Sequence, residues 1–224
     1  FAVPGFLDKE SCAALRRKAA ASLAPQGFDD AEGGTRTSVG AVAHSSEVAG
    51  LRDRLASLAR VPLAHLQPLK ISRYSPGAQF SMHTDAWRGN LFGQEPSPDD
   101  WWADLPRLQH GVLGGPISGA NRVCTVFIYL SDCDEGGRTV WNWTDYDSGG
   151  GLGRRFYDEP GPGHGRTNAE GAGVPCTVSP REGLAVIHFP ATTARSGGFT
   201  DYNAYHAAEP AVTEKWIAQQ FIWR

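Results

Sequence analysis

The chain has 224 residues, with 21 Lys and Arg against 24 Asp and Glu and a formal net charge of −3. No basic run or stripe stands out, so a nucleic-acid backbone is not an expected partner. No apolar stretch approaches the roughly 18 residues needed to span a bilayer, and the opening FAVPGFLDKE has neither an initiator Met nor a signal-peptide pattern. We therefore expect a soluble, trimmed chain without a membrane partner, forming one catalytic domain over residues 1–224.

Two helices are predicted in a helical support region that covers residues 1–66. Asp8 can cap the first, whose apolar residues recur at helical spacing: Cys12, Leu15, Ala19 and Leu23. The second runs from about Ser46 to Arg60 and is closed by Pro62. Its apolar face comprises Val48, Leu51, Leu55 and Leu58.

Residues 67–224 contain short predicted strands separated by Gly and Pro turns. These strands are Leu69–Tyr74, Phe80–Asp85, Arg122–Leu130, Gly183–Phe189, Ala204–Glu209 and Glu214–Trp223. Because no helix lies between them, the pattern favours an antiparallel sandwich or jelly roll over an α/β sheet. Two long loops, 86–121 and 142–180, interrupt the strands, and loops of such length are usually lids, binding loops or disordered segments.

The four cysteines are far apart and form no C-x-x-C pair: Cys12, Cys124, Cys133 and Cys176. This spacing argues against a zinc knuckle or a thioredoxin-like site. One or two disulfides are allowed, so cysteine usage does not fix the compartment.

His83 and Asp85 are two residues apart on a predicted strand, so both side chains leave the same face. Such an H-x-D pair is common by chance, and alone it is most simply a surface His beside a solvated Asp. His206, however, lies in another predicted strand far along the chain, which a sandwich can bring close. Two His and one carboxylate leave metal coordination positions open, and this arrangement suits non-haem iron(II) oxygenases.

Lys215 begins the last predicted strand. The residues that share its face are Ile217, Gln219, Phe221 and Trp223. A buried Lys without a partner is costly, so an inward Lys215 would require an anion, such as the carboxylate of a cosubstrate. The opposite row is also partly apolar, and periodicity leaves open which row faces the core: Trp216, Ala218, Gln220 and Ile222.

Several segments resemble prolyl 4-hydroxylase catalytic domains, in the order in which that family has them. The family's opening helix is matched by FLDKESCAAL, and its R-T-S-x-G segment by RTSVG. The approach to the first metal ligands is matched by PLKISRYSPGAQFSMHTD, and the R-x-x-T-x-x-x-Y-L segment with E-G-G-x-T by NRVCTVFIYLSDCDEGGRTVW. The strand before the distal His, that His and the 2-oxoglutarate Lys are matched by PREGLAVIHFP, YHAAEP and KW.

The resemblance implies a mainly β double-stranded β-helix (jelly roll) with N-terminal supporting helices, and a 2-oxoglutarate-dependent dioxygenase of the procollagen-proline 4-dioxygenase type. It implies His83, Asp85 and His206 as iron ligands and Lys215 as the partner of the distal 2-oxoglutarate carboxylate. Tyr74 and Tyr129 would border the cosubstrate, with Thr125 on the same cavity face, although Tyr and Thr are also ordinary strand residues. The implied cofactors are Fe(II), 2-oxoglutarate, dioxygen and ascorbate.

The implied reaction hydroxylates a C–H bond of peptidyl proline and releases succinate and CO2. Arg122 matches an Arg near the substrate in family members, with an exposed strand start as the alternative interpretation. The chain departs from peptidyl-proline hydroxylases at Phe80, where they commonly have Tyr, and at Phe221 and Trp223, where they carry Trp and His. Lys215 also follows the distal His one residue sooner than is usual. We therefore expect altered substrate contacts around a retained iron and cosubstrate set.

Trp101 and Trp102 lie in the loop 86–121, which directly follows Asp85. We expect them to form part of the substrate entrance, because their large faces suit an extended proline-rich peptide. A small satellite core is the alternative interpretation.

Two other functions are compatible with these residues. The first is the same chemistry on a free amino acid or other small molecule, which the changed substrate positions permit. The second is a non-catalytic jelly-roll binding module, which would have no need for four inward polar groups. A zinc hydrolase is a weaker candidate, since no motif supplies its general base. The remaining histidines are expected to be structural: His44, His65, His110, His164 and His188.

Overall fold

The structure is a computed structural model that describes residues 1–26, 35–86, 122–141, 176–191 and 204–223. Two antiparallel sheets make up most of it. The larger has the strand order β1 (Ala2–Val3), β9 (Ala185–His188), β6 (Arg122–Tyr129), β11 (Lys215–Trp223), β4 (Lys70–Tyr74), β3 (Val39–Val42) and β2 (Ala24–Pro25). The smaller has the order β5 (Phe80–His83), β10 (His206–Ala208), β7 (Thr139–Trp141) and β8 (Cys176–Val178).

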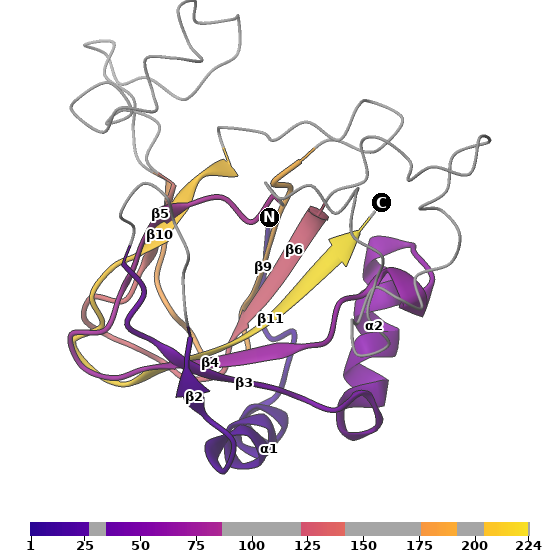
Figure 1. Ribbon diagram of the computed structural model, residues 1–224, viewed down its shortest axis with the longest axis horizontal. Helices are drawn as coiled ribbons and strands as arrows, with labels where there is room; N and C mark the ends of the chain where they lie inside the picture. The colour runs from indigo at the N-terminus through magenta and orange to yellow at the C-terminus, as the bar shows by residue number, and fades with distance from the viewer. Residues whose placement is uncertain (27–34, 87–121, 142–175, 192–203, 224) are drawn as a thin grey trace, which may run out of the picture.

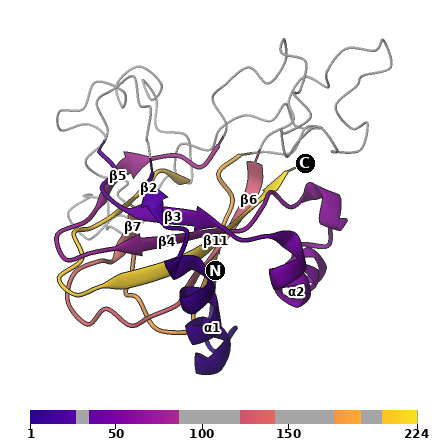
Figure 2. The same cartoon turned by 60° about the horizontal axis from the view of Figure 1, so that its bottom comes forward.

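Helices α1 (Lys9–Ala20) and α2 (Ala49–Ala59) lie on one side of the larger sheet, with β5 and β10 on its other side (Figures 1 and 2). Two short 3-10 helices, η1 (Ser45–Val48) and η2 (Leu63–His65), flank α2. This mainly β architecture with supporting N-terminal helices confirms the predicted jelly-roll fold class. Residues 1–66 are nevertheless not only a helical support, because they also supply β1, β2 and β3. The predicted loop 142–180 likewise contains β8.

The first predicted helix forms with the predicted cap. Asp8 accepts a hydrogen bond of 2.7 Å from the Ser11 backbone N–H, which satisfies a donor that the first helical turn leaves open. Its buried residues are Cys12, Leu15 and Ala19. Leu23 lies beyond the helix and packs only partly against the same core.

The second helix buries most of its predicted face, because Val48 and Leu55 are buried and Leu51 packs partly against the core. Its predicted start, Ser46–Val48, belongs to the 3-10 helix η1, which turns every three residues. In the α-helix that follows, Ala56 is buried beside Leu55, whereas Leu58 is 42% exposed. The helix ends at Ala59, and its C-cap Arg60 has a left-handed φ of 54° that turns the chain before Pro62.

All six predicted strands are present, with shorter bounds than the sequence suggested. The difference that concerns the site is at β5, which ends at His83. Asp85 therefore lies in a bend after the strand, and the prediction that it shares a strand with His83 is wrong.

Two cores explain why the periodicity of β11 was ambiguous. One core packs the helices against the larger sheet and includes Trp216, Ala218 and Ile222. The other lies between the two sheets and includes Ile217, Phe127 and Trp141. Both faces of β11 are thus buried, and Lys215 belongs to the face that looks toward the smaller sheet.

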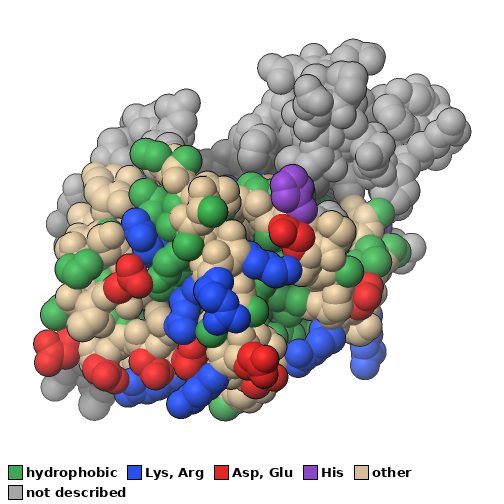
Figure 3. Space-filling model, turned by 90° about the horizontal axis from the view of Figure 1, so that it is seen from below, with side chains coloured by type: hydrophobic (Ala, Val, Ile, Leu, Met, Phe, Trp, Pro, Cys, Tyr) green, Lys and Arg blue, Asp and Glu red, His purple; other side chains and the backbone are tan. Residues whose placement is uncertain are grey.

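Three observations bear on the expectations drawn from composition. All four cysteines are free, so the allowed disulfides do not form. No helix in the described part of the chain is long and apolar enough to cross a membrane. On the face shown in Figure 3, basic and acidic side chains are intermixed instead of gathered by sign.

Gly183 is required by the fold, because its φ is +82° and an added Cβ would collide with the backbone carbonyl oxygen of Leu7. We expect Gly183→Ala to lower the free energy of unfolding by about 1–3 kcal/mol. Gly50 is the matched control, since it lies inside α2 with no atom within 4 Å of the added Cβ. Gly50→Ala should raise the free energy of unfolding by about 0.5–1 kcal/mol. Urea denaturation measures both, and equal shifts in the two variants would contradict the expectation.

Candidate metal centre

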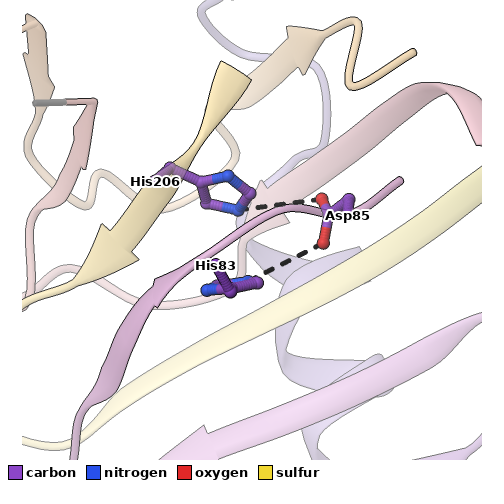
Figure 4. Close-up of side chains that lie close together, drawn as sticks. All are labelled: His83, Asp85 and His206. Atoms are coloured by element: carbon purple, nitrogen blue, oxygen red, sulfur yellow. Dashed lines mark ion pairs between the residues drawn. The ribbon is translucent and has the colours of Figure 1, made fainter. Parts of the chain in front are cut away.

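His83, Asp85 and His206 converge on one point between the sheets (Figure 4). Strand β5 pairs with β10 so that His83 lies opposite His206, and the bend after β5 brings Asp85 to the same point. The Asp85 carboxylate lies 3.8 Å from Nε2 of His83 and 3.7 Å from Nε2 of His206. One ligand atom from each residue lies within 4.8 Å of the others, and all three side chains are buried.

Backbone carbonyls orient both imidazoles. Nδ1 of His83 lies 2.8 Å from the Ser81 carbonyl oxygen, and Nδ1 of His206 lies 3.0 Å from that of Ala204. When Nδ1–H donates to a carbonyl, Nε2 carries the lone pair, and in both residues this atom faces Asp85. The same arrangement is found around metal-bound histidines.

Burial and mutual contact also set the protonation states. Burial, helped by the nearby His206, lowers the pKa of His83 to about 3, and burial lowers that of His206 to about 4. Burial alone would raise the pKa of Asp85, but the three neighbouring histidines hold it well below its ordinary value. Two neutral imidazoles and one carboxylate are the forms that bind a divalent metal. The donor set therefore fits iron(II) with further coordination positions open.

His188 was expected to be structural, yet it lies against the candidate ligands. It projects from β9, and its Nε2 lies 3.1 Å from Oδ2 of Asp85. Its ring centroid is 4.7 Å from that of His206 and 5.7 Å from that of Trp141. Since Asp85 is ionised, His188 donates this hydrogen bond and fixes the carboxylate. The alternation of side chains along this segment indicated that His188 points inward. Only the fold shows that it meets Asp85.

A pocket adjoins the two imidazoles and reaches Lys215. Its lining comprises Tyr74, Phe80, His83, Phe127, Thr139, His206, Ala208, Lys215, Ile217 and Gln219. The Lys215 side chain is 1% exposed; its Nζ donates to the Gly137 carbonyl at 2.8 Å and lies 4.2 Å from the Tyr74 ring centroid. Burial lowers the pKa of Lys215 to about 8, and it forms no ion pair with any acidic residue that the structure describes. The pocket therefore suits an anionic molecule that also reaches a metal.

The other residues predicted near a cosubstrate divide into two groups. Tyr74 lines the pocket beside Lys215. Tyr129 and Thr125 do not line it: the Tyr129 hydroxyl lies 2.7 Å from Oγ1 of Thr139, and Thr125 is fully buried. Thr139 was missed, although it is the Thr of the E-G-G-x-T match and does line the pocket.

The residues predicted near the substrate contact different parts of the candidate site. Phe80 lines the pocket and stacks on His83, with ring centroids 3.6 Å apart. Arg122 stacks over Phe221 at 4.1 Å and donates to the Asp85 carbonyl at 3.3 Å. Trp223 is buried near the same guanidinium, 5.7 Å away.

Some predictions fall on residues that the structure does not describe, namely Trp101 and Trp102 and also His110 and His164. Of the other histidines, His65 is buried with Nδ1 2.8 Å from the Trp223 carbonyl oxygen, and His44 is exposed.

The fold and the buried His-Asp-His cluster define a jelly-roll protein with a candidate non-haem metal centre. No protein-family model matches the chain. It is similar to solved structures of a viral collagen prolyl hydroxylase from Paramecium Bursaria Chlorella virus-1 (TM-score 0.57, 17% identity, 100% of this chain and 94% of that one) and a Pseudomonas putida prolyl-4-hydroxylase (TM-score 0.51, 16% identity, 100% and 91%). At such low sequence identities, the structural similarity is evidence for the fold alone.

The chain is also similar in sequence to curated proteins. Probable prolyl 4-hydroxylase 9 of Arabidopsis thaliana is 24% identical over 98% of this chain and 66% of its own length. Prolyl 4-hydroxylase 13 of the same plant is 23% identical over 99% of this chain and 70% of its own length. These similarities confirm the resemblance to prolyl 4-hydroxylases predicted from the motifs and agree with the predicted enzyme class. The chain spans about two thirds of the length of these relatives.

The role of His188 can be separated from that of the candidate ligands by measuring metal affinity. Asp85→Ala should abolish tight binding of Fe(II) or Mn²⁺, because it removes the charged ligand. His188→Gln should weaken binding by about 10–100-fold, the usual effect of losing a partner that orients a ligand. His44→Gln, at an exposed position, is the control and should bind metal normally. Calorimetry under anaerobic conditions gives the affinities, and normal metal binding by His188→Gln would remove it from this role.

Proposed function

We propose that the chain is an Fe(II)- and 2-oxoglutarate-dependent dioxygenase that hydroxylates a C–H bond, with peptidyl proline as the leading target and succinate and CO2 as coproducts. One observation carries the proposal. A buried ammonium, Lys215, lines the same pocket as two imidazoles of a three-residue metal cluster. 2-Oxoglutarate has one carboxylate that can pair with this ammonium and a 2-oxo acid group that can bind a metal at the cluster.

In this function His83, Asp85 and His206 hold the iron, and His188 keeps the Asp85 carboxylate in place. When bound, iron(II) with 2-oxoglutarate and dioxygen supplies the oxidising power for the C–H bond, and ascorbate would keep the iron reduced. The protein contributes binding, orientation and exclusion of water.

Lys215 anchors the far carboxylate of 2-oxoglutarate. Its lowered pKa reflects a buried ammonium that lacks a carboxylate partner among the described residues, and the cosubstrate would supply one. The Thr139 hydroxyl and the Tyr74 ring line the pocket beside it, while Phe127 and Ile217 give it apolar walls. Tyr129 supports this wall from behind, because its hydroxyl shares a hydrogen bond with Thr139.

Peptidyl proline is favoured as the target because the curated relatives are named prolyl 4-hydroxylases. Substrate would approach the centre beside the residues at the positions that the resemblance assigns to substrate contact, namely Phe80, Arg122, Phe221 and Trp223. Trp101 and Trp102 would extend this surface. We further propose that residues 1–224 act as one catalytic domain.

The direct test is conversion of 2-oxoglutarate to succinate by the purified protein with Fe(II) and ascorbate, with and without proline-rich peptides. Mass spectrometry should find one added oxygen atom on a prolyl residue. Slow succinate formation without any peptide is also expected, and it should stop when the metal is chelated. Binding of peptide with no succinate from the metal-loaded protein would favour the non-catalytic binding module instead.

Lys215 gives a prediction that depends on pH. Lys215→Ala should weaken 2-oxoglutarate binding by roughly 3–5 kcal/mol, which is at least about a hundredfold, because a buried charge loses its partner. In the native protein the Lys215 pKa is about 8, so the ammonium is present below pH 8. The affinity for 2-oxoglutarate should therefore fall as the pH rises above 8.

Two variants serve as controls for this titration. Lys215→Arg stays charged and should show a flatter pH profile, whereas Lys9→Ala, at an exposed position on α1, should behave as the native protein does. Unchanged 2-oxoglutarate affinity in Lys215→Ala would show that the cosubstrate carboxylate binds elsewhere.

A further inference from the structure

Lys70 lies on the pocket side of the larger sheet, outside the pocket itself. On the paired strands β4 and β11, Lys70 lies opposite Gln219, just as Tyr74 lies opposite Lys215. Alternate residues of a strand share a face, so Lys70 projects on the same side of the sheet as these three residues. Its side chain is partly exposed, which leaves it open to a ligand.

Lys70 and Arg122 both lie near the aromatic ring of Phe221. Nζ of Lys70 lies 5.9 Å and Cζ of Arg122 lies 4.1 Å from the centroid of Phe221. Arg122 also donates to the backbone carbonyl of Asp85, one of the three candidate ligands. The two cations thus border the place where a substrate would meet the centre.

The charge of Lys70 is not balanced within the described residues. Burial and the like charges of Arg36 and Arg122 lower its pKa to about 8, and Asp85 is the one described acidic group that opposes them. The Asp85 carboxylate is already held by His188 and faces the two metal-site imidazoles. Lys70 forms no ion pair with an acidic side chain in the part of the chain that the structure describes, so a further anion would offset the cost of its position.

The surroundings of Arg36 favour binding of an anion over binding of a neutral ligand. Its guanidinium stacks over Phe80 at 4.5 Å, and its described hydrogen-bond partners are all neutral: Gln26, Ser38 and Ser72. Arg36 therefore adds positive potential near Lys70 without a described carboxylate to cancel it.

We propose that the substrate carries a carboxylate that pairs with Lys70 beside the Phe221 ring. This inference rests on the proposed function, because it assumes that the target carbon lies near the metal centre. The carboxylate could be the α-carboxylate of free proline or of a C-terminal proline, or the side chain of an acidic residue beside an internal proline. In each case Lys70 selects the substrate, while Lys215 serves the cosubstrate.

Matched substrates test the pairing and distinguish its sources. Free L-proline and its amide form the first pair, a peptide ending in proline and its C-terminal amide the second, and peptides with internal Pro-Glu and Pro-Gln the third. We expect the native protein to hydroxylate the acid of at least one pair with a kcat/KM about tenfold or more above its neutral partner, as one lost ion pair would give. Lys70→Met should bring that ratio close to one, and Lys9→Met, at an exposed position, should leave it unchanged.

Two further measurements keep this test independent of folding and of turnover. Lys70→Glu should reverse the preference toward a Pro-Lys peptide, which an unfolded variant could not do. Calorimetry of each acid and its neutral partner with the Mn²⁺- and 2-oxoglutarate-loaded protein should show the same preference without catalysis. Equal binding within all three pairs, or an acid preference that survives in Lys70→Met, would overturn the proposal. Succinate formation without substrate reports on the proposed function separately, so the two can fail independently.

Discussion

The pairing of β5 with β10 is the constraint on which the site depends. It sets His83 opposite His206, and the bend after β5 then carries Asp85 to the same point. The carbonyl of Ser81, within β5, and that of Ala204, just before β10, orient both rings. One antiparallel ladder therefore sets both the distance between the imidazoles and their tautomers, so the ligand geometry follows from backbone pairing.

Burial of charge between the two sheets connects this ladder to the rest of the pocket. The imidazoles stay neutral there because burial disfavours their charged forms, and the carboxylate stays ionised because the neighbouring histidines lower its pKa. Lys215 is different, because its described partners are a carbonyl and an aromatic ring. A cation in so dry a position gives the pocket a preference for anions, and that preference suits a dicarboxylate cosubstrate.

The surface where substrate is proposed to approach also carries cations. These cations are more exposed to solvent than Lys215. Arg36, Lys70 and Arg122 lie around Phe80 and Phe221, two of the positions at which the sequence departs from peptidyl-proline hydroxylases. Arg122 connects this surface to the candidate metal site, because it hydrogen-bonds to the backbone carbonyl of Asp85. The iron and cosubstrate region thus resembles the family, whereas the adjoining charged surface is where this chain would set its own specificity.

The sequence by itself determined the fold class, the helix cap at Asp8 and the three residues that meet in the candidate metal site. Local chemistry encodes these features: strand and turn propensities, a capping side chain, and motifs whose order matches a family. It could not choose the inward row of β11, because both faces of that strand are buried and both rows are partly apolar. It also missed that His188 meets Asp85 and that Thr139 lines the pocket, because both facts depend on contacts between distant strands. Only the tertiary structure decided those, because sheet packing sets which buried polar group meets which partner.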